Sequence, residues 1–123
     1  MGIGDLFVES KLTEKDFTQK EASVVEEYVD LDKQFHKKYL RREGGDFDNY
    51  QIIRNLLAAT QHNKRHILLC DERRPDLVQR YMETVCCARD IHTRNKCRVV
   101  FWQEIRKACG AALNQYLEEK YGF

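Results

Sequence analysis

Short apolar segments that alternate with longer helical patterns constrain the fold of this chain more than any other feature. Segments 6–12, 67–70 and 97–101 have the length and apolar content of strands, and the first of them alternates apolar with polar residues. Segments 49–61 and 75–89 repeat apolar residues every three or four positions, as amphipathic helices do. Strands that alternate with helices are typical of parallel sheets with crossover connections. The sequence therefore predicts an α/β fold with about three strands and helices packed around them.

Local signals set the bounds of the two helices. Asp48 is the predicted N-cap of a helix that begins near Asn49, and Pro75 suits the first position of the helix over 75–89. The apolar side of this second helix comprises Leu77, Val78, Tyr81, Met82, Val85 and Cys86. Both helices are expected to pack on the sheet through such a side.

Three further segments have helical spacing. Residues 21–42 are charged but carry apolar residues at helical intervals, which predicts a helix that Gly44-Gly45-Asp46 terminates. Residues 102–109 and 111–120 predict two closing helices that are separated near Gly110. The chain lacks internal repeats, linkers and low-complexity segments.

Length and charge bound the class of protein. A chain of 123 residues is expected to form one domain, 1–123, with a modest core. The 21 basic and 20 acidic residues leave a net charge of +1, so no overall field demands nucleic acid as a partner. An enzyme that contacts phosphate locally remains compatible with this balance. No apolar run approaches the length of a membrane span, so no membrane partner is expected.

The cysteines indicate the redox compartment. Cys70, Cys86, Cys87, Cys97 and Cys109 are odd in number and form no C-x-x-C pair, and a secretory apolar segment is absent. We therefore expect a reducing, cytoplasmic compartment. The spacing of these cysteines relative to the four histidines matches no standard zinc finger.

Polar segments follow each of the three predicted strands. They are 11–14, 71–74 and 102–104. The carboxyl ends of parallel strands meet at one edge of a sheet, where ligands of such folds collect. These polar segments are therefore expected to converge.

Glu9 and Lys11 are the most informative pair at that edge. Their spacing places both side chains on the same face of a strand, roughly 6.5–7 Å apart along the chain. A carboxylate and an ammonium so placed can hold a divalent metal and a neighbouring phosphate together. Glu-x-Lys is common by chance, however, and a salt-bridged or solvated strand face explains it equally simply.

Longer motifs carry a family resemblance. Residues 8–14 read VESKLTE and residues 50–55 read YQIIRN, and together they resemble the Glu-x-Lys strand and glutamine-bearing helix of PD-(D/E)XK nucleases. The segments LCDERRPDL at 69–77, WQEI at 102–105 and EKYGF at 119–123 are similar to the C-terminal part of a bacterial group of restriction-endonuclease-like proteins. The resemblance spreads over nearly the whole chain and implies a restriction-endonuclease-like core.

The chemistry implied by the resemblance is metal-dependent hydrolysis of DNA. Mg²⁺, or Mn²⁺ in its place, would be held by the Glu9 carboxylate and the Ser10 carbonyl, and would activate a water. Lys11 would position that water and offset charge on the phosphate in the transition state, while Gln51 would orient water or phosphate. Glu9, Lys11 and Gln51 are thus the implied catalytic residues.

The same resemblance suggests residues for contacts with the substrate. Arg54 and Asn55 lie three and four positions after Gln51, on the same side of the helix. Arg73 and Arg74 are candidates for contacts with DNA phosphates at the rim of the site. A basic cluster near the end of segment 21–42 is a further candidate; its members are His36, Lys37, Lys38, Arg41 and Arg42.

The chain departs from the family pattern before the Glu-x-Lys strand. The pattern places an acidic metal ligand on a preceding strand, yet only five residues precede Leu6. Asp5 is a poor substitute, because four strand residues separate it from Glu9 by roughly 13 Å. The helix and hairpin expected upstream are also missing, which predicts an unpaired edge on the Glu9 strand. Three explanations stay open: a fragment of a longer nuclease, pairing with a partner or a second copy, and loss of catalysis.

Several of these residues have simpler structural explanations. Gln51 stands three positions after Asp48, which is the spacing of a capping box. Arg73 and Arg74 have acidic neighbours with which they can pair. Trp102 is expected to be a core or lid aromatic. Two functions therefore remain, a metal-dependent nuclease domain and a non-catalytic α/β module for protein interaction or self-association.

Overall fold

The large sheet has four strands, and three of them are parallel. The computed structural model of the chain describes residues 2–12, 15–28 and 30–122. The strand order is β1 (Gly2–Ile3), β2 (Leu6–Ser10), β6 (Arg65–Cys70) and β7 (Cys97–Phe101). β2, β6 and β7 run in the same direction, which confirms the α/β prediction. β7 has the predicted bounds, and β2 ends two residues earlier than predicted.

The sequence suggested an unpaired outer edge on β2, but the structure shows that this edge is paired in part. β1 returns through a tight turn and pairs antiparallel with Leu6 and Phe7. Gly4 lies in this turn with a φ of 58°, a left-handed conformation that costs glycine little. The first two residues of β2 thus have strand partners on both sides.

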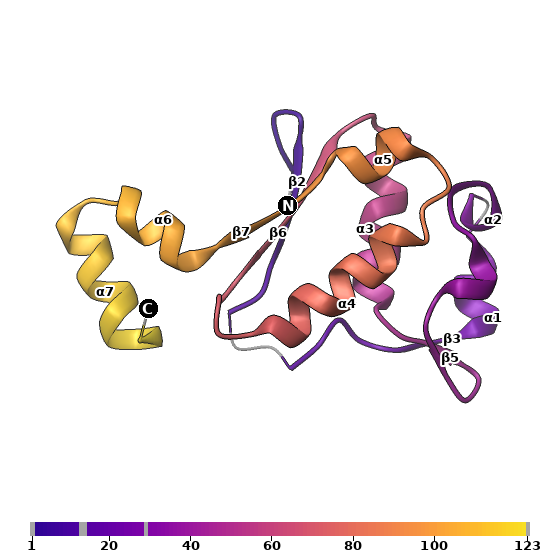
Figure 1. Ribbon diagram of the computed structural model, residues 1–123, viewed down its shortest axis with the longest axis horizontal. Helices are drawn as coiled ribbons and strands as arrows, with labels where there is room; N and C mark the ends of the chain where they lie inside the picture. The colour runs from indigo at the N-terminus through magenta and orange to yellow at the C-terminus, as the bar shows by residue number, and fades with distance from the viewer. Residues whose placement is uncertain (1, 13–14, 29, 123) are drawn as a thin grey trace.

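Helices pack mainly on one side of the large sheet (Figure 1). α3 (Tyr50–Gln61) lies against β2 and β6, and α4 (Pro75–Cys86) lies beside α3. The short α5 (Ile91–Asn95), which the sequence pattern did not predict, leads into β7. α6 (Trp102–Ala108) and α7 (Ala111–Tyr121) form a hairpin that extends to the left in Figure 1, close to their predicted bounds.

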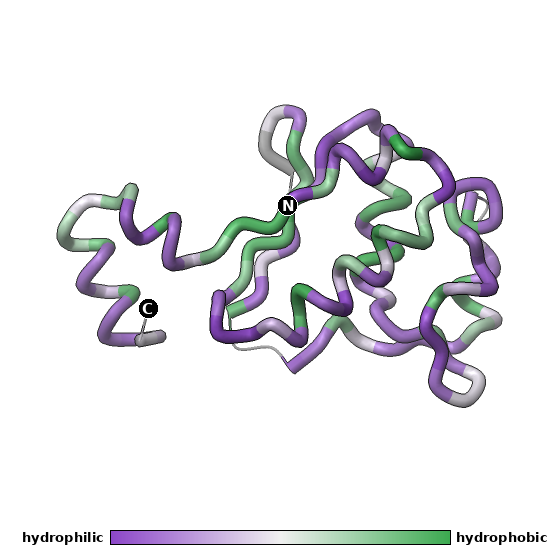
Figure 2. Tube along the Cα trace, viewed as in Figure 1, coloured by the Kyte–Doolittle hydropathy of each residue, from purple (hydrophilic) through white to green (hydrophobic). Residues whose placement is uncertain are grey.

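The core fills the space between the sheet and these helices. Leu68 on β6, Ile52 and Ile53 on α3, and Tyr81 on α4 are wholly inaccessible to solvent. Figure 2 shows hydrophobic residues along β6 and β7 and polar residues on the outer loops. In α4, however, Met82 is 45% exposed and Cys86 is also exposed, so both were wrongly assigned to its apolar side.

The predicted helix over 21–42 is wrong. The segment instead contains two helices of one turn each, α1 (Ala22–Val25) and α2 (Leu31–Gln34), and the 3₁₀ turn η1 (Lys37–Tyr39). A small antiparallel sheet, which was not predicted, flanks them. Its order is β3 (Lys20–Glu21), β5 (Asp46–Phe47) and β4 (Arg42–Glu43).

Pairing between distant segments explains why no long helix forms there. The amide of His36 donates to the carbonyl of Cys87 at 2.7 Å, and the amide of Arg89 donates to the carbonyl of Gln34 at 2.8 Å. These bonds hold Phe35 in an extended conformation beside Ala88. They also account for the end of α4 at Cys86, three residues before the predicted bound, because Ala88 and Arg89 pair with residues 34–36 instead of continuing the helix.

Candidate functional site

Glu9 and Lys11 lie at the carboxyl end of β2 and face α3. Glu9 is aligned with Leu68 of β6, and the amide of Lys11 continues the ladder by donating to the carbonyl of Leu69 at 2.8 Å. Alternation along a strand puts Phe7, Glu9 and Lys11 on one face. Phe7 packs edge-on against His62, just beyond α3, and Glu9 meets Asn55 of α3, so this face points toward the helix.

The Lys11 side chain is buried and held on several sides. Its exposed fraction is 3%, and its ammonium donates to Oε1 of Gln51 at 2.5 Å. The same Nζ lies 3.6 Å from Oε1 of Glu9 and 5.2 Å from the centre of the Phe17 ring. Because burial of a charge is costly without such partners, this arrangement fixes the position of the ammonium.

The Glu9 carboxylate is shared between Lys11 and α3. The amide of Asn55 donates to Oε2 of Glu9, while Oε1 faces the Lys11 ammonium. Asn55 follows Gln51 by one helical turn, so both amides project from the same side of α3. The helix therefore presents one acceptor to Lys11 and one donor to Glu9.

The segment before α3 sets the position of this helix. Asn49 adopts a left-handed conformation with a φ of 58°, and the amides of Tyr50 and Gln51 donate to the carbonyls of Thr18 and Phe17 at 2.9 and 3.0 Å. Asn49, rather than Asp48, is the N-cap residue, and it makes no side-chain capping bond. Gln51 is therefore free of the capping role and turns its side chain to Lys11.

Asp48 has a different role from the predicted one. Its carboxylate is buried, accepts from the Gln19 amide at 2.6 Å and lies 3.1 Å from Nε of Arg41. These two contacts of Asp48 connect the small sheet to the start of α3. Members of the predicted basic cluster are likewise paired, because Lys37, Arg41 and Arg42 all contact acidic residues.

Trp102 links the site to the C-terminal helices. Its indole Nε1 donates to the carbonyl of Lys11 at 3.1 Å. No local sequence pattern predicts this bond, because it depends on how β2 and β7 are each aligned with β6, which lies between them. The bond anchors the first residue of α6 to the residue that supplies the buried ammonium.

Three of the arginines that the sequence suggested as DNA contacts lie outside this cluster of side chains. Arg54 lies over the Tyr50 ring at 5.4 Å, beside a hollow that Tyr28 and Asp30 also line. Arg73 makes a bidentate pair with Asp71, with its shortest contact at 2.6 Å, and Arg74 pairs with Asp76 at 2.9 Å. The pairing that the acidic neighbours suggested is thus what the structure contains.

Arg73 also connects the end of β6 to the end of the chain. Its Nη2 donates to the carbonyl of Tyr121 at 2.9 Å, and its Nη1 donates to that of Gly122 at 3.2 Å. Bonds from the Arg73 side chain, with a further one from the Gln103 amide, lower the pKa of Asp71 to about 2. Asp71 is consequently an anion whose lone pairs are already used.

The oxygen donors at this site suit Mg²⁺ only if the protein supplies very few of its ligands. The Glu9 carboxylate and the adjacent Ser10 carbonyl are hard ligands, and Mg²⁺ often binds one or two carboxylates and completes its shell with water and substrate phosphate. Within residues 2–12, 15–28 and 30–122, no group of three histidine, cysteine or acidic side chains is placed to hold a metal. Asp5 is exposed and lies 3.9 Å from Arg65, so it does not join Glu9.

No described helix has both the length and the apolar composition needed to span a bilayer.

Comparison with known proteins identifies the family. Neither a curated protein nor a solved structure matches the chain. A family model described as "Restriction Endonuclease associating with ARP" matches residues 1–122. The chain therefore belongs to this restriction endonuclease family.

Proposed function

We propose that Glu9, Lys11, Gln51 and Asn55 form the reaction centre of a metal-dependent nuclease that acts on DNA. The observation that carries this proposal is the buried Lys11 ammonium, fixed by a neutral amide at 2.5 Å and by a carboxylate at 3.6 Å. A fixed cation beside a carboxylate is the arrangement needed to stabilise charge on a phosphate during hydrolysis. The restriction endonuclease family supports the same chemistry.

Glu9 and the Ser10 carbonyl would hold Mg²⁺, with Mn²⁺ as a substitute. When bound, the metal would lower the pKa of a water and polarise the scissile phosphate. Because the chain offers one carboxylate here, phosphate oxygens of the substrate are needed to complete the coordination. Metal binding and DNA binding should therefore strengthen one another.

The chain's own residues divide the remaining work. Lys11 donates hydrogen bonds to the non-bridging phosphate oxygens and offsets their growing charge. Gln51 holds the ammonium in place through its Oε1 and turns toward the attacking water through its amide nitrogen. Asn55 orients the Glu9 carboxylate through its amide. Trp102 positions the end of β2 from the other side.

DNA cleavage by the purified chain tests the proposal. With Mg²⁺ or Mn²⁺ present, the wild type should cut duplex DNA, and Glu9→Gln and Lys11→Met should each slow cleavage by about 10²-fold or more. Asp5→Asn and Lys107→Met are matched controls that remove a carboxylate and an ammonium away from the site, and they should cleave like the wild type. Equal cleavage by Lys11→Met and the wild type would refute the assignment.

A non-catalytic α/β interaction module is the second candidate function. It is favoured by the state of the Glu9 carboxylate, which already contacts Lys11 and Asn55 and has no second acidic residue beside it among the described residues. Calorimetric titration of Mg²⁺, with and without DNA, separates the two functions. A folded wild type that binds no metal under either condition would support the interaction module.

A further inference from the structure

Two adjoining hollows lie at the end of the sheet opposite to Glu9 and Lys11. Arg65 begins β6 and Cys97 begins β7, and the two parallel strands start side by side. Lys96 lies between the hollows and lines both of them. The six residues of β6 span about 17 Å, so a ligand held here is not the phosphate that Lys11 would contact.

The first hollow is lined almost wholly by cations. It has a volume of about 260 Å³, and its lining residues are Arg65, Asn95, Lys96 and Arg98. Three of these four side chains carry a positive charge, and none of the four is acidic. Arg65 lies 3.9 Å from Asp5, but both side chains are more than two-thirds exposed, so this pair offsets little of the charge.

Neutral acceptors, rather than carboxylates, hold the other two cations. Nζ of Lys96 donates to Oδ1 of Asn63 at 2.5 Å, and Nη1 of Arg98 donates to the carbonyls of Asn95 and Cys97 at 2.8 Å each. No carboxylate of the described residues makes a salt bridge with Lys96 or Arg98. Both cations are therefore pre-positioned while their charge remains available to an anion.

Other arginines of the chain fall into two groups. Arg73, Arg74 and Arg106 each contact a carboxylate at 2.6 to 3.1 Å, whereas Arg89 and Arg94 donate to backbone carbonyls, as Arg98 does. The Lys96 edge differs from both groups because three cations line one hollow there. A cluster of like charges with few internal counter-charges is unfavourable by itself and gains from a bound anion.

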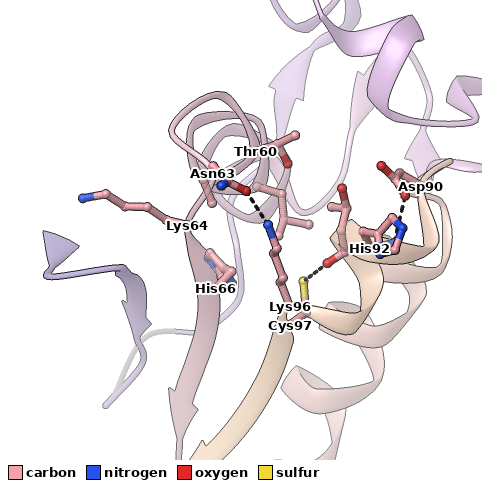
Figure 3. A pocket seen from close by; sticks show the side chains of 11 residues that line it. Thr60, Asn63, Lys64, His66, Asp90, His92, Lys96 and Cys97 are labelled. Carbon is pink, nitrogen blue, oxygen red and sulfur yellow. Dashed lines mark hydrogen bonds between the residues drawn. The ribbon is translucent and has the colours of Figure 1, made fainter.

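The second hollow adds hydrogen-bond donors (Figure 3). It has a volume of about 110 Å³, the space of three to four waters. Figure 3 shows Lys96 reaching toward Asn63 while Lys64 extends away from the hollow, and Thr60 lies beside Asn63. Asp90, the one acidic residue of the lining, accepts from the amide of His92 at 2.8 Å, which caps α5.

A buried histidine lines the inner wall of this second hollow. His66 is 1% exposed, and its Nδ1 lies 2.8 Å from the hydroxyl of Tyr81. Nε2 of the same ring is buried and has no hydrogen-bond partner among the described residues, and as a ring N–H it can donate to a phosphate oxygen.

We propose that this edge binds a phosphate group, with Lys96 and Arg98 as its charged contacts and Arg65 at the rim. The phosphate is either free inorganic phosphate or a backbone phosphate of nucleic acid, because both present the same oxygens. Two cations fixed by neutral acceptors supply the attraction, and the donors of the second hollow supply the hydrogen bonds. The proposal does not depend on catalysis at Glu9.

Phosphate titration of the full chain tests the site. The wild type is kept in EDTA so that no DNA is cut, and backbone amides are followed by NMR as inorganic phosphate is added. The amides of residues 63 and 95–98 should shift in a saturable way. Lys96→Met and Arg98→Met should each weaken binding about fivefold or more, as expected for the loss of one charged contact. Lys107→Met on α6 removes an exposed ammonium elsewhere and should bind like the wild type.

Duplex DNA distinguishes the two sources of phosphate. If nucleic acid is the ligand, both variants should also weaken DNA binding and lower the slope of log affinity against log salt by about one each. If free phosphate is the ligand, the variants lose phosphate affinity and keep that for DNA. The proposal is overturned if neither ligand shifts residues 95–98, or if the variants bind both ligands like the wild type. Cleavage is not measured here, so this result leaves the proposed nuclease function untouched.

Discussion

The pairing of Glu9 with Lys11 should have a large and measurable coupling energy. The two charges lie 3.6 Å apart, and the exposed fractions of their side chains are 13% and 3%. At an effective dielectric constant of about 20, two unit charges at this distance attract by about 4.6 kcal/mol. Desolvation of both groups opposes this attraction, so we expect a coupling of about 2–4 kcal/mol.

A double-mutant cycle with Glu9→Gln and Lys11→Met measures this coupling. Urea unfolding of the wild type, both single variants and the double variant gives four free energies of unfolding, from which the pairwise energy follows. The stability losses of the two single variants should add up to more than the loss in the double variant, because each single variant leaves one charge without its partner. Glutamine keeps an acceptor for Asn55, so that contact is not the quantity measured.

The Asp5–Arg65 pair provides the matched control. Its charges are separated by a similar 3.9 Å, but its side chains are 76% and 68% exposed. The cycle with Asp5→Asn and Arg65→Met should therefore give less than about 1 kcal/mol. A coupling for Glu9–Lys11 as small as that of the control would refute the reasoning that burial makes the site electrostatically tight.

Three further perturbations probe the interior and the end of the chain. Burial lowers the pKa of His66 to about 4, so the unfolded chain binds the proton first; wild-type stability should fall by about 3 kcal/mol between pH 6.5 and 4, and urea unfolding of His66→Gln should show a flatter pH dependence. Tyr81→Phe leaves Nδ1 of His66 without its partner and should cost about 1–3 kcal/mol in free energy of unfolding. Arg73→Met should raise the pKa of Asp71 from about 2 toward its ordinary value, seen in carboxyl NMR titrations, and should speed hydrogen exchange at the end of α7.

The elements that pack directly on the sheet could be predicted from the sequence. β6 and β7 carry short apolar runs, α3 and α4 each bury one apolar face, and Pro75 marks the start of α4. The local pattern of each element agrees with its tertiary environment, which is why the local pattern was enough to locate it. The same agreement holds for Glu9 and Gln51, because alternation on a strand and spacing on a helix decide which way each side chain points.

Segment 21–42 could not be predicted in the same way, because contacts distant in sequence shape it. Val25, Leu31 and Phe35 all reach the core, as their spacing suggested, but they do so from separate short elements. The bonds from residues 34 and 36 to residues 87 and 89 determine where the helical turns end. A periodic pattern records which side chains are buried, and it does not record whether the backbone between them is continuous.

The candidate site was likewise only partly accessible from the sequence. Asn55 was expected to contact DNA, whereas its amide lies on Glu9, a role set by the distance between α3 and β2. Arg73 and Arg74 each pair with an acidic residue two positions away, as the local sequence suggested. The indole bond from Trp102 to Lys11 required the register of three strands at once.

That indole bond gives the protein a built-in optical probe. Trp102 is the single tryptophan of the chain, so its emission arises from one place, one hydrogen bond away from Lys11. Any ligand that displaces the end of β2 should change the polarity around the indole and hence the wavelength of its fluorescence. Occupancy of the site can therefore be followed in the unlabelled protein, in real time and at low concentration.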